Sequence, residues 1–157
     1  MSSSNPAPVV SNSSPLIALA DVGKLGLLET LFGTVFIPAA VAVEISPTVI
    51  APAWLRTKAL SQPMPVPIRQ STLGAGECEA IALALELNAS RLVLDDRDAR
   101  ATATSLNIPI IGVLGILLAA KRHGALPAIR PVLEDLGRHG FLCAPELERK
   151  VLADAGE

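Results

Sequence analysis

Short apolar segments alternate with longer helical segments along most of this chain of 157 residues. The short segments are rich in Val, Ile and Leu, as is typical of buried β-strands, and they span residues 9–11, 34–37, 91–94 and 108–111. Helical patterns separate and follow them, over residues 16–22, 24–32, 38–45, 51–60, 77–87, 97–106, 113–123, 129–139 and 146–155. This alternation predicts βαβ units with a central parallel sheet. Because the strands are apolar on both faces, we expect a three-layer, Rossmann-like α/β/α domain.

One domain is expected over residues 9–157, since a chain of this length fits one domain and is short for two. Residues 1–8 are rich in Ser, Pro and Asn and are expected to form a flexible N-terminal tail. Ser14 and Pro15 predict the start of the first helix, as a hydroxyl cap followed by proline at the first helical position. The prolines in residues 63–67 predict an extended linker.

Composition narrows the class of protein. Half of the residues are hydrophobic, which excludes intrinsic disorder. The longest apolar run, residues 108–120, contains Pro109 and is shorter than the roughly 20 residues of a membrane span. The first ten residues contain no Lys or Arg, so no secretory signal is expected, and Cys78 and Cys143 form no paired metal-binding motif. We therefore expect a reduced, cytoplasmic protein without membrane attachment.

The net charge of −2 does not indicate a broad positively charged surface of the kind that binds nucleic acids. Thirteen Lys and Arg stand against fifteen Asp and Glu, and three Phe, one Trp and no Tyr leave few platforms for base stacking. A polyanion would therefore have to be held locally, by a few Arg side chains or by a metal ion.

Polar residues directly follow two of the predicted strands. Asn12, Ser13 and Ser14 come after residues 9–11, and Asp95 and Asp96 come after residues 91–94. Ligands of open α/β sheets bind outside the carboxyl ends of the strands, which makes these residues candidates for a site. Local roles stay open as alternatives: Asp96 as the cap of the following helix, and the first three as turn and cap residues.

Two glutamates lie in apolar surroundings. Glu44 is the only charged residue between Glu29 and Arg56, and a carboxylate placed there needs a partner. On a helical wheel, Glu77 shares the apolar face of its helix, whereas Glu79 is expected to face solvent. The alternatives are a structural ion pair between Glu44 and a distant Arg, and a first-turn helix-dipole role for Glu77.

Carboxylates from separate strand ends repel one another unless a cation lies between them. Hard oxygen ligands select Mg²⁺ or Mn²⁺, and such an ion neutralises phosphate charge and activates water. The pattern therefore predicts a metal-dependent phosphodiester hydrolase. The sequence contains no P-loop motif and no GxGxxG after a strand, which leaves nucleotide-binding alternatives unsupported.

Five motifs in this order resemble the PIN-domain superfamily, in particular its prokaryotic branch of nucleic-acid-binding, PIN-like proteins. They are VSNSSPLI at residues 10–17, IPxxVxxE at 37–44, LGxGExEAI at 73–81, LDDxxAR at 94–100 and GxLGILLxAK at 112–121. The resemblance implies a ribonuclease fold with an acidic Mg²⁺ or Mn²⁺ site. Many such proteins are VapC-like toxins that cleave RNA, are held silent by a small cognate antitoxin protein, and form homodimers.

The resemblance also implies roles for individual residues. The implied metal ligands are Asn12, Glu44, Glu77, Asp95 and Asp96, of which Glu44, Glu77 and Asp96 are also the implied catalytic residues. Ser14 and Asp98 are implied as supporting residues. The candidates for binding the RNA backbone are Arg97, Arg100, Lys121 and Arg122, with a structural ion pair as the alternative for Arg100.

Asn12 departs from the family pattern, in which Asp occupies the first acidic position. An amide oxygen can ligate a metal but contributes no negative charge, so metal affinity should fall. The leading hypothesis is a metal-dependent endoribonuclease, the toxin of a toxin–antitoxin pair; its rival is a catalytically weak or inactive PIN-like nucleic-acid-binding or regulatory protein. A third hypothesis is a homodimerising interaction module, because a mean hydropathy of +0.48 favours a buried apolar interface.

Overall fold

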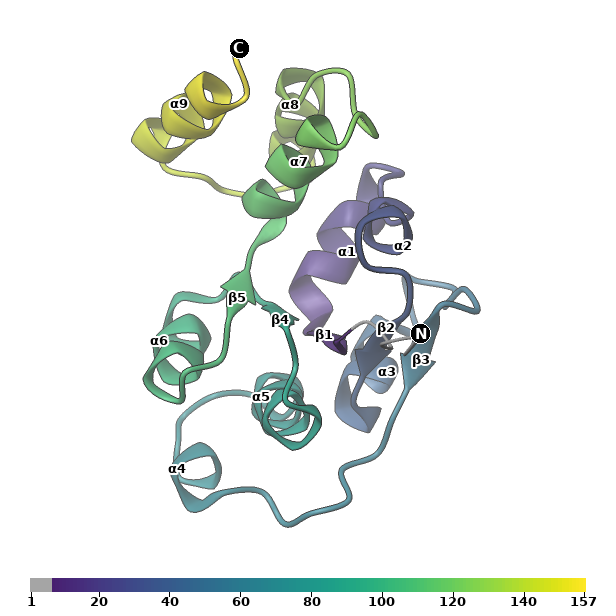
Figure 1. Ribbon diagram of the computed structural model, residues 1–157, viewed down its shortest axis with the longest axis vertical. Coiled ribbons are helices and arrows are strands. Elements are labelled where there is room, and N and C mark those ends of the chain that lie inside the picture. The colour runs from purple at the N-terminus through teal and green to yellow at the C-terminus, as the bar shows by residue number, and fades with distance from the viewer. Residues whose placement is uncertain (1–6) are drawn as a thin grey trace, which may run out of the picture.

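A five-stranded parallel sheet forms the centre of the computed structural model, which describes residues 7–157 (Figure 1). Its strands, in chain order, are β1 (Val9–Ser11), β2 (Val35–Ile37), β3 (Leu55–Thr57), β4 (Arg91–Val93) and β5 (Ile110–Ile111). They lie in the order β3-β2-β1-β4-β5, and every neighbouring pair is parallel. The predicted parallel sheet is therefore confirmed.

Helices cover both faces of this sheet (Figure 1). Within residues 7–157 they are α1 (Ser13–Asp21), α2 (Leu27–Phe32), α3 (Ala39–Ile45), α4 (Val66–Arg69), α5 (Ala75–Leu87), α6 (Arg97–Ser105), α7 (Val113–Arg122), α8 (Arg130–Arg138) and α9 (Pro145–Asp154). α1, α2, α7, α8 and α9 lie on one side of the sheet, and α4, α5 and α6 on the other. The core is divided accordingly: Val9 packs into one cluster and Val10 into the other, because successive strand side chains alternate in direction. These layers confirm the three-layer α/β/α fold.

The helix predicted over residues 51–60 is wrong, because the middle of this segment forms the edge strand β3. Leu55 is the only buried residue of β3, so the segment lacks the apolar run that marks the other strands. Pairing with β2 determines its conformation instead, and the Val35 N–H donates to the Trp54 carbonyl at 2.9 Å. Tertiary pairing has overridden local propensity here.

The extended linker predicted over residues 63–67 is wrong at its end, and part of the expected flexible tail is held in place. Residues 66 and 67 begin α4, because Ile68 is fully buried on the side of α5 and draws this segment into a helical turn. Of the expected tail, residues 1–6 lie outside the described residues, and Ala7 and Pro8 are bound to Ser90. The Ser90 N–H donates to the Pro8 carbonyl at 2.8 Å, and its hydroxyl donates to the Ala7 and Pro8 carbonyls. Among residues 7–157, no helix combines the length and the apolar character that a membrane crossing needs.

The strand order defines where a ligand site should form. From β1 the chain continues to β2, towards one edge of the sheet, and from β4 it continues to β5, towards the opposite edge. Sites of open α/β sheets lie at such a switch point, outside the carboxyl ends of the strands. Ser11 pairs with Val93, and the Asn12 N–H donates to the Val93 carbonyl at 3.0 Å. We call the residues that follow β1 and β4 here, Asn12–Ser13 and Leu94–Asp96, the switch-point edge.

Candidate functional site

Asn12 carries an oxygen without a partner at the switch-point edge. Asn12 is 2% exposed and is the N-cap of α1, which begins at Ser13 rather than at the predicted Ser14. An N-cap side chain usually accepts a hydrogen bond from the second or third helical N–H, but the third helical residue is Pro15, which has no N–H. In the described part of the chain, Asn12 Oδ1 is the buried side-chain atom without a hydrogen-bond partner. This oxygen is free to bind a ligand from outside the chain.

The Glu44 carboxylate from α3 contacts residues of α1 and α5. The Ser13 hydroxyl donates to its Oε2, and the Gly76 N–H donates to its Oε1 at 3.1 Å. A Cβ on Gly76 would lie 2.7 Å from Glu44 Cδ, so the exposed Glu44 carboxylate would have to move to admit a side chain there. The hydroxyl that contacts an acid is therefore that of Ser13, whereas Ser14, the supporting residue implied by the sequence, is exposed. Both ion pairs between the described residues involve other side chains, so no Arg neutralises Glu44.

Glu79 has a role that the helical wheel did not indicate. The wheel predicts a solvent-facing side chain, but Glu79 Oε1 accepts a hydrogen bond from the Ala40 N–H at 3.1 Å. Ala40 lies in the first turn of α3, where N–H groups have no partner within the helix. Together with the contact between Gly76 and Glu44, this bond holds α3 and α5 antiparallel. The wheel fails because α5 packs against α3 as well as against the sheet.

Glu77, in the first turn of α5, is one of four carboxylates that influence one another. Partial burial raises the pKa of Glu77, and the negative charges of Asp96, Glu44 and Asp98 raise it further. Asp96 is also the N-cap of α6, since its Oδ1 accepts from the Ala99 N–H at 2.8 Å. The structure thus brings acids from α3, α5 and the end of β4 into one negatively charged region. Neither ion pair between the described residues involves one of these acids, so no Lys or Arg side chain is paired with them.

Asp95 is directed towards α7 instead. Both of its carboxylate oxygens accept from the Val113 N–H, at 3.2 and 3.3 Å. Burial raises the pKa of Asp95, and the Val113 hydrogen bond and the Arg100 charge act in the opposite direction. Asp95 therefore lies at the N-terminus of α7 and is not among the acids whose charges raise the pKa of Glu77. Of the implied RNA-binding residues, Arg97 is exposed beside Asp96, and Arg100 lies near Asp95.

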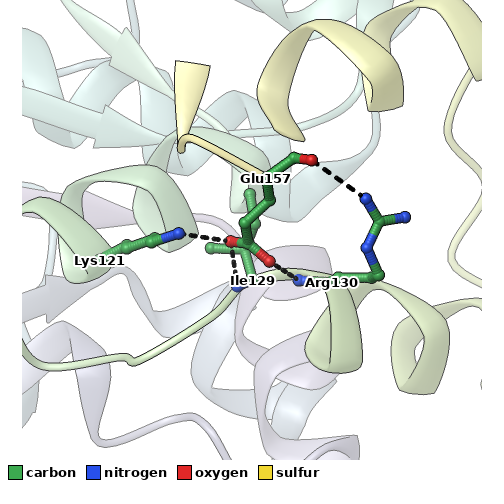
Figure 2. Close-up of polar contacts among 4 residues, drawn as sticks. All are labelled: Lys121, Ile129, Arg130 and Glu157. Atoms are coloured by element: carbon green, nitrogen blue, oxygen red, sulfur yellow. Dashed lines mark hydrogen bonds and ion pairs between the residues drawn. The ribbon is translucent and has the colours of Figure 1, made fainter. Parts of the chain in front are cut away.

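Lys121 is held away from the acidic region. Figure 2 shows its ammonium group paired with the Glu157 carboxylate, with Nζ 2.9 Å from Oε2. The same carboxylate accepts hydrogen bonds from the Ile129 and Arg130 N–H groups. Lys121 lies eight residues along α7 from Val113, which corresponds to roughly 12 Å of helix. The structure therefore does not bring Lys121, or the neighbouring Arg122, into the region of Glu77.

Glu157 should make the stability of the α7–α9 region depend on pH. Hydrogen bonds from the Ile129 N–H and the Lys121 side chain lower the pKa of Glu157 to about 2. A lowered folded-state pKa stabilises the fold above the unfolded-state value, and this contribution is lost as pH falls towards 2. Thermal melts between about pH 2 and pH 6 should show wild type gaining Tm over Glu157→Gln as pH rises. Glu134→Gln, at an exposed position on α8, is the control, and parallel pH profiles for wild type and Glu157→Gln would contradict the assignment.

The residues at the switch-point edge fit an oxygen-ligated divalent cation. Asn12 provides an unpaired oxygen, and the neighbouring donors are carboxylates, which are hard ligands suited to Mg²⁺ or Mn²⁺. In the part of the chain that the structure describes, no three Asp, Glu, His or Cys side chains are already close enough to enclose a metal. The described residues therefore form an acidic region and not a preformed metal cage.

Comparison with known proteins agrees with this geometry. Residues 8–157 match the family model described as DUF3368, PIN domain. The fold is similar to the solved structure of a PilT N-terminus domain protein from the hyperthermophilic archaeon Sulfolobus solfataricus P2, with a TM-score of 0.55 and 21% sequence identity. That similarity covers 71% of this chain and 92% of the archaeal chain. A search of curated proteins gave no match.

The sheet order and the helices on both faces define an α/β/α protein with acidic residues near the switch-point edge. The match over nearly the whole chain shows that this protein belongs to the PIN domain family, whose members are generally nucleases. The resemblance predicted from the sequence motifs is therefore confirmed.

Proposed function

We propose that this protein is a Mg²⁺- or Mn²⁺-dependent endoribonuclease that hydrolyses RNA phosphodiester bonds. The proposal rests on one juxtaposition: the buried, unpartnered Asn12 Oδ1 lies at the same sheet edge as the mutually repelling acids around Glu77. An uncharged buried oxygen and an unneutralised group of carboxylates are both stabilised by the same ligand, a divalent cation.

Each side chain has a place in the proposed mechanism. Asn12, Glu44, Glu77 and Asp96 would hold the cation, which when bound supplies an activated water and neutralises phosphate charge. Ser13 and Gly76 orient the Glu44 carboxylate through their hydrogen bonds. Asp98 adds negative charge near Glu77, and the exposed Arg97 is placed to contact the RNA backbone. Asp95 orients α7 and supports the adjacent Asp96 from outside the ligand set.

The biological role proposed is that of a cytoplasmic toxin restrained by a small cognate antitoxin protein, with the toxin acting as a homodimer. Two features support a protein partner. The mean hydropathy of +0.48 is high, and two apolar side chains close to Glu44 in sequence are exposed, Val43 by 72% and Ile50 by 97%. Such exposed apolar groups favour a covering surface.

A second function is favoured by Asn12 itself. Its amide leaves the site one negative charge short of a ligand set with Asp at this position. Asp95 faces the Val113 N–H and is not among the acids whose charges raise the pKa of Glu77, so it does not replace the missing charge. The alternative is therefore a PIN-domain protein that binds or regulates nucleic acid with weak or no turnover.

Cleavage of end-labelled RNA with Mn²⁺ or Mg²⁺, with and without a chelator, distinguishes the two functions. We expect wild type to cleave, chelation to abolish cleavage, and Asp96→Asn to lower the rate by at least about tenfold. Asn is as good an N-cap as Asp, so Asp96→Asn retains the start of α6 and changes mainly the charge. Asp154→Asn, at the end of α9, is the control.

The remaining outcomes decide the alternative. Cleavage by Asn12→Asp alone would assign the natural protein to the second function. Cleavage that persists in chelator and in Asp96→Asn would exclude metal catalysis at this site.

A further inference from the structure

A cavity of about 450 Å³ opens at the free edge of the sheet, beside β5 and α7. Ile111 and Leu114 line it from β5 and α7, and Phe141 and Leu142 line it from the segment that precedes α9. Leu142 is 91% exposed although it is apolar. Cavities of this size, with apolar walls and a few polar groups that fix orientation, are typical of small-molecule sites.

Asp95 and Arg100 supply the polar groups of this cavity. The Asp95 oxygens share one N–H donor, that of Val113, and a carboxylate can accept about four hydrogen bonds. Both ion pairs of residues 7–157 lie elsewhere, so the Arg100 guanidinium is not bound to a carboxylate. Gly112 lies between the two groups: a Cβ there would touch Asp95 Oδ1 and lie 3.0 Å from Arg100 Nη1. An acceptor and a forked donor therefore lie on either side of Gly112, and both line a cavity with mostly apolar walls.

This pair complements one nucleobase best. Guanine presents two adjacent donors, N1–H and the N2 amino group, which match the two oxygens of a carboxylate. Its O6 and N7 acceptors match the fork of a guanidinium. The apolar side chains and the Phe141 ring can contact the faces of a base, as in proteins that bind single-stranded RNA.

The cavity adjoins the proposed catalytic region through the chain itself. Asp95 lines the cavity, and the next residue, Asp96, belongs to the acids around Glu77. Resting on the proposed ribonuclease function, we propose that this cavity binds a base of the RNA next to the scissile phosphate and that Asp95 and Arg100 select guanine.

Alkylation of Cys143 provides a test that does not depend on cleavage. Cys143 lines the cavity and is half-buried, while the other thiol, Cys78, is buried. Burial and the negative charge of Glu148 raise the pKa of the Cys143 thiol. The full chain is therefore treated with iodoacetamide in chelator at about pH 9, above the usual thiol pKa, and modification is read by peptide mass. GMP should slow modification of Cys143, and AMP, CMP and UMP should require at least about tenfold higher concentrations for the same effect.

Arg100→Lys separates base recognition from simple charge attraction. Lysine keeps the positive charge but lacks the planar fork of donors, so the preference for GMP should fall by about tenfold. Arg149→Lys is the matched control, because Arg149 is exposed on α9 and does not line the cavity.

Each outcome decides the proposal. Equal protection by all four nucleotides would overturn guanine selection, and no protection by any of them would overturn the base site and leave the cavity to a protein partner. RNA cleavage without GMP protection would retain the proposed function and reject this site. Protection by GMP without RNA cleavage would retain this base site and reject the proposed ribonuclease function.

Discussion

Asn12→Asp is expected to raise the affinity of the protein for Mn²⁺ on the order of 100-fold, because it adds a unit negative charge beside a divalent ion in a buried place. Asn12 is 2% exposed, and its Oδ1 has no donor. Without metal, the new carboxylate would be desolvated, and the neighbouring Ser13 already contacts another carboxylate, that of Glu44. The metal-free variant should therefore be less stable than wild type by about 1–3 kcal/mol.

Asn12→Asp is thus expected to destabilise the metal-free protein and to stabilise the Mn²⁺-bound protein, so the sign of its effect on Tm should depend on metal. Thermal melts with chelator should give a lower Tm for Asn12→Asp, and melts with increasing Mn²⁺ should reverse the order. Titration calorimetry gives the affinity directly. Asn107→Asp, at an exposed position after α6, controls for the added charge. Equal Mn²⁺ affinities of wild type and Asn12→Asp would show that this position is not a ligand.

The sequence predicts that the polar residues after β1 and β4 lie at a ligand site because the two strands are easily recognised. Each is an apolar run that ends in polar residues, and parallel strands place their carboxyl ends at one edge. The match between Val10 and Leu92 in the sheet then brings Asn12 near the residues after β4. The family motifs add Glu44 and Glu77, whose neighbourhood the structure shows.

Other features depend on partners that a linear sequence does not reveal. β3 is recognised only by its pairing with β2, and Glu79 only by the Ala40 N–H that lies opposite it. Whether Ser13 or Ser14 contacts Glu44 depends on a single-residue choice of helix start, the least predictable feature of a helix. Asp95 differs from Asp96 only in the direction of its side chain, which the buried N-terminus of α7 determines.

Gly76→Ala is expected to reduce RNA cleavage by about 100-fold, because small displacements of a catalytic group have effects of this size. The added Cβ would meet the Glu44 carboxylate, which Gly76 now approaches closely enough to donate its N–H. The effect on stability should be small. The Glu44 side chain is exposed and can swing away from the new methyl group, and Ala in a helix is normally more stable than Gly by up to about 1 kcal/mol.

Gly74→Ala provides the matched control two residues earlier, since its Cβ would meet nothing nearer than Glu77 Oε1 at 4.0 Å. It should leave cleavage and Tm close to those of wild type. The double variant Gly76→Ala, Glu44→Ala removes the carboxylate that the new methyl group displaces, so it should cleave RNA no more slowly than Glu44→Ala alone. A Gly76→Ala protein with higher Tm and full cleavage would show that Glu44 need not lie against α5 for the site to work.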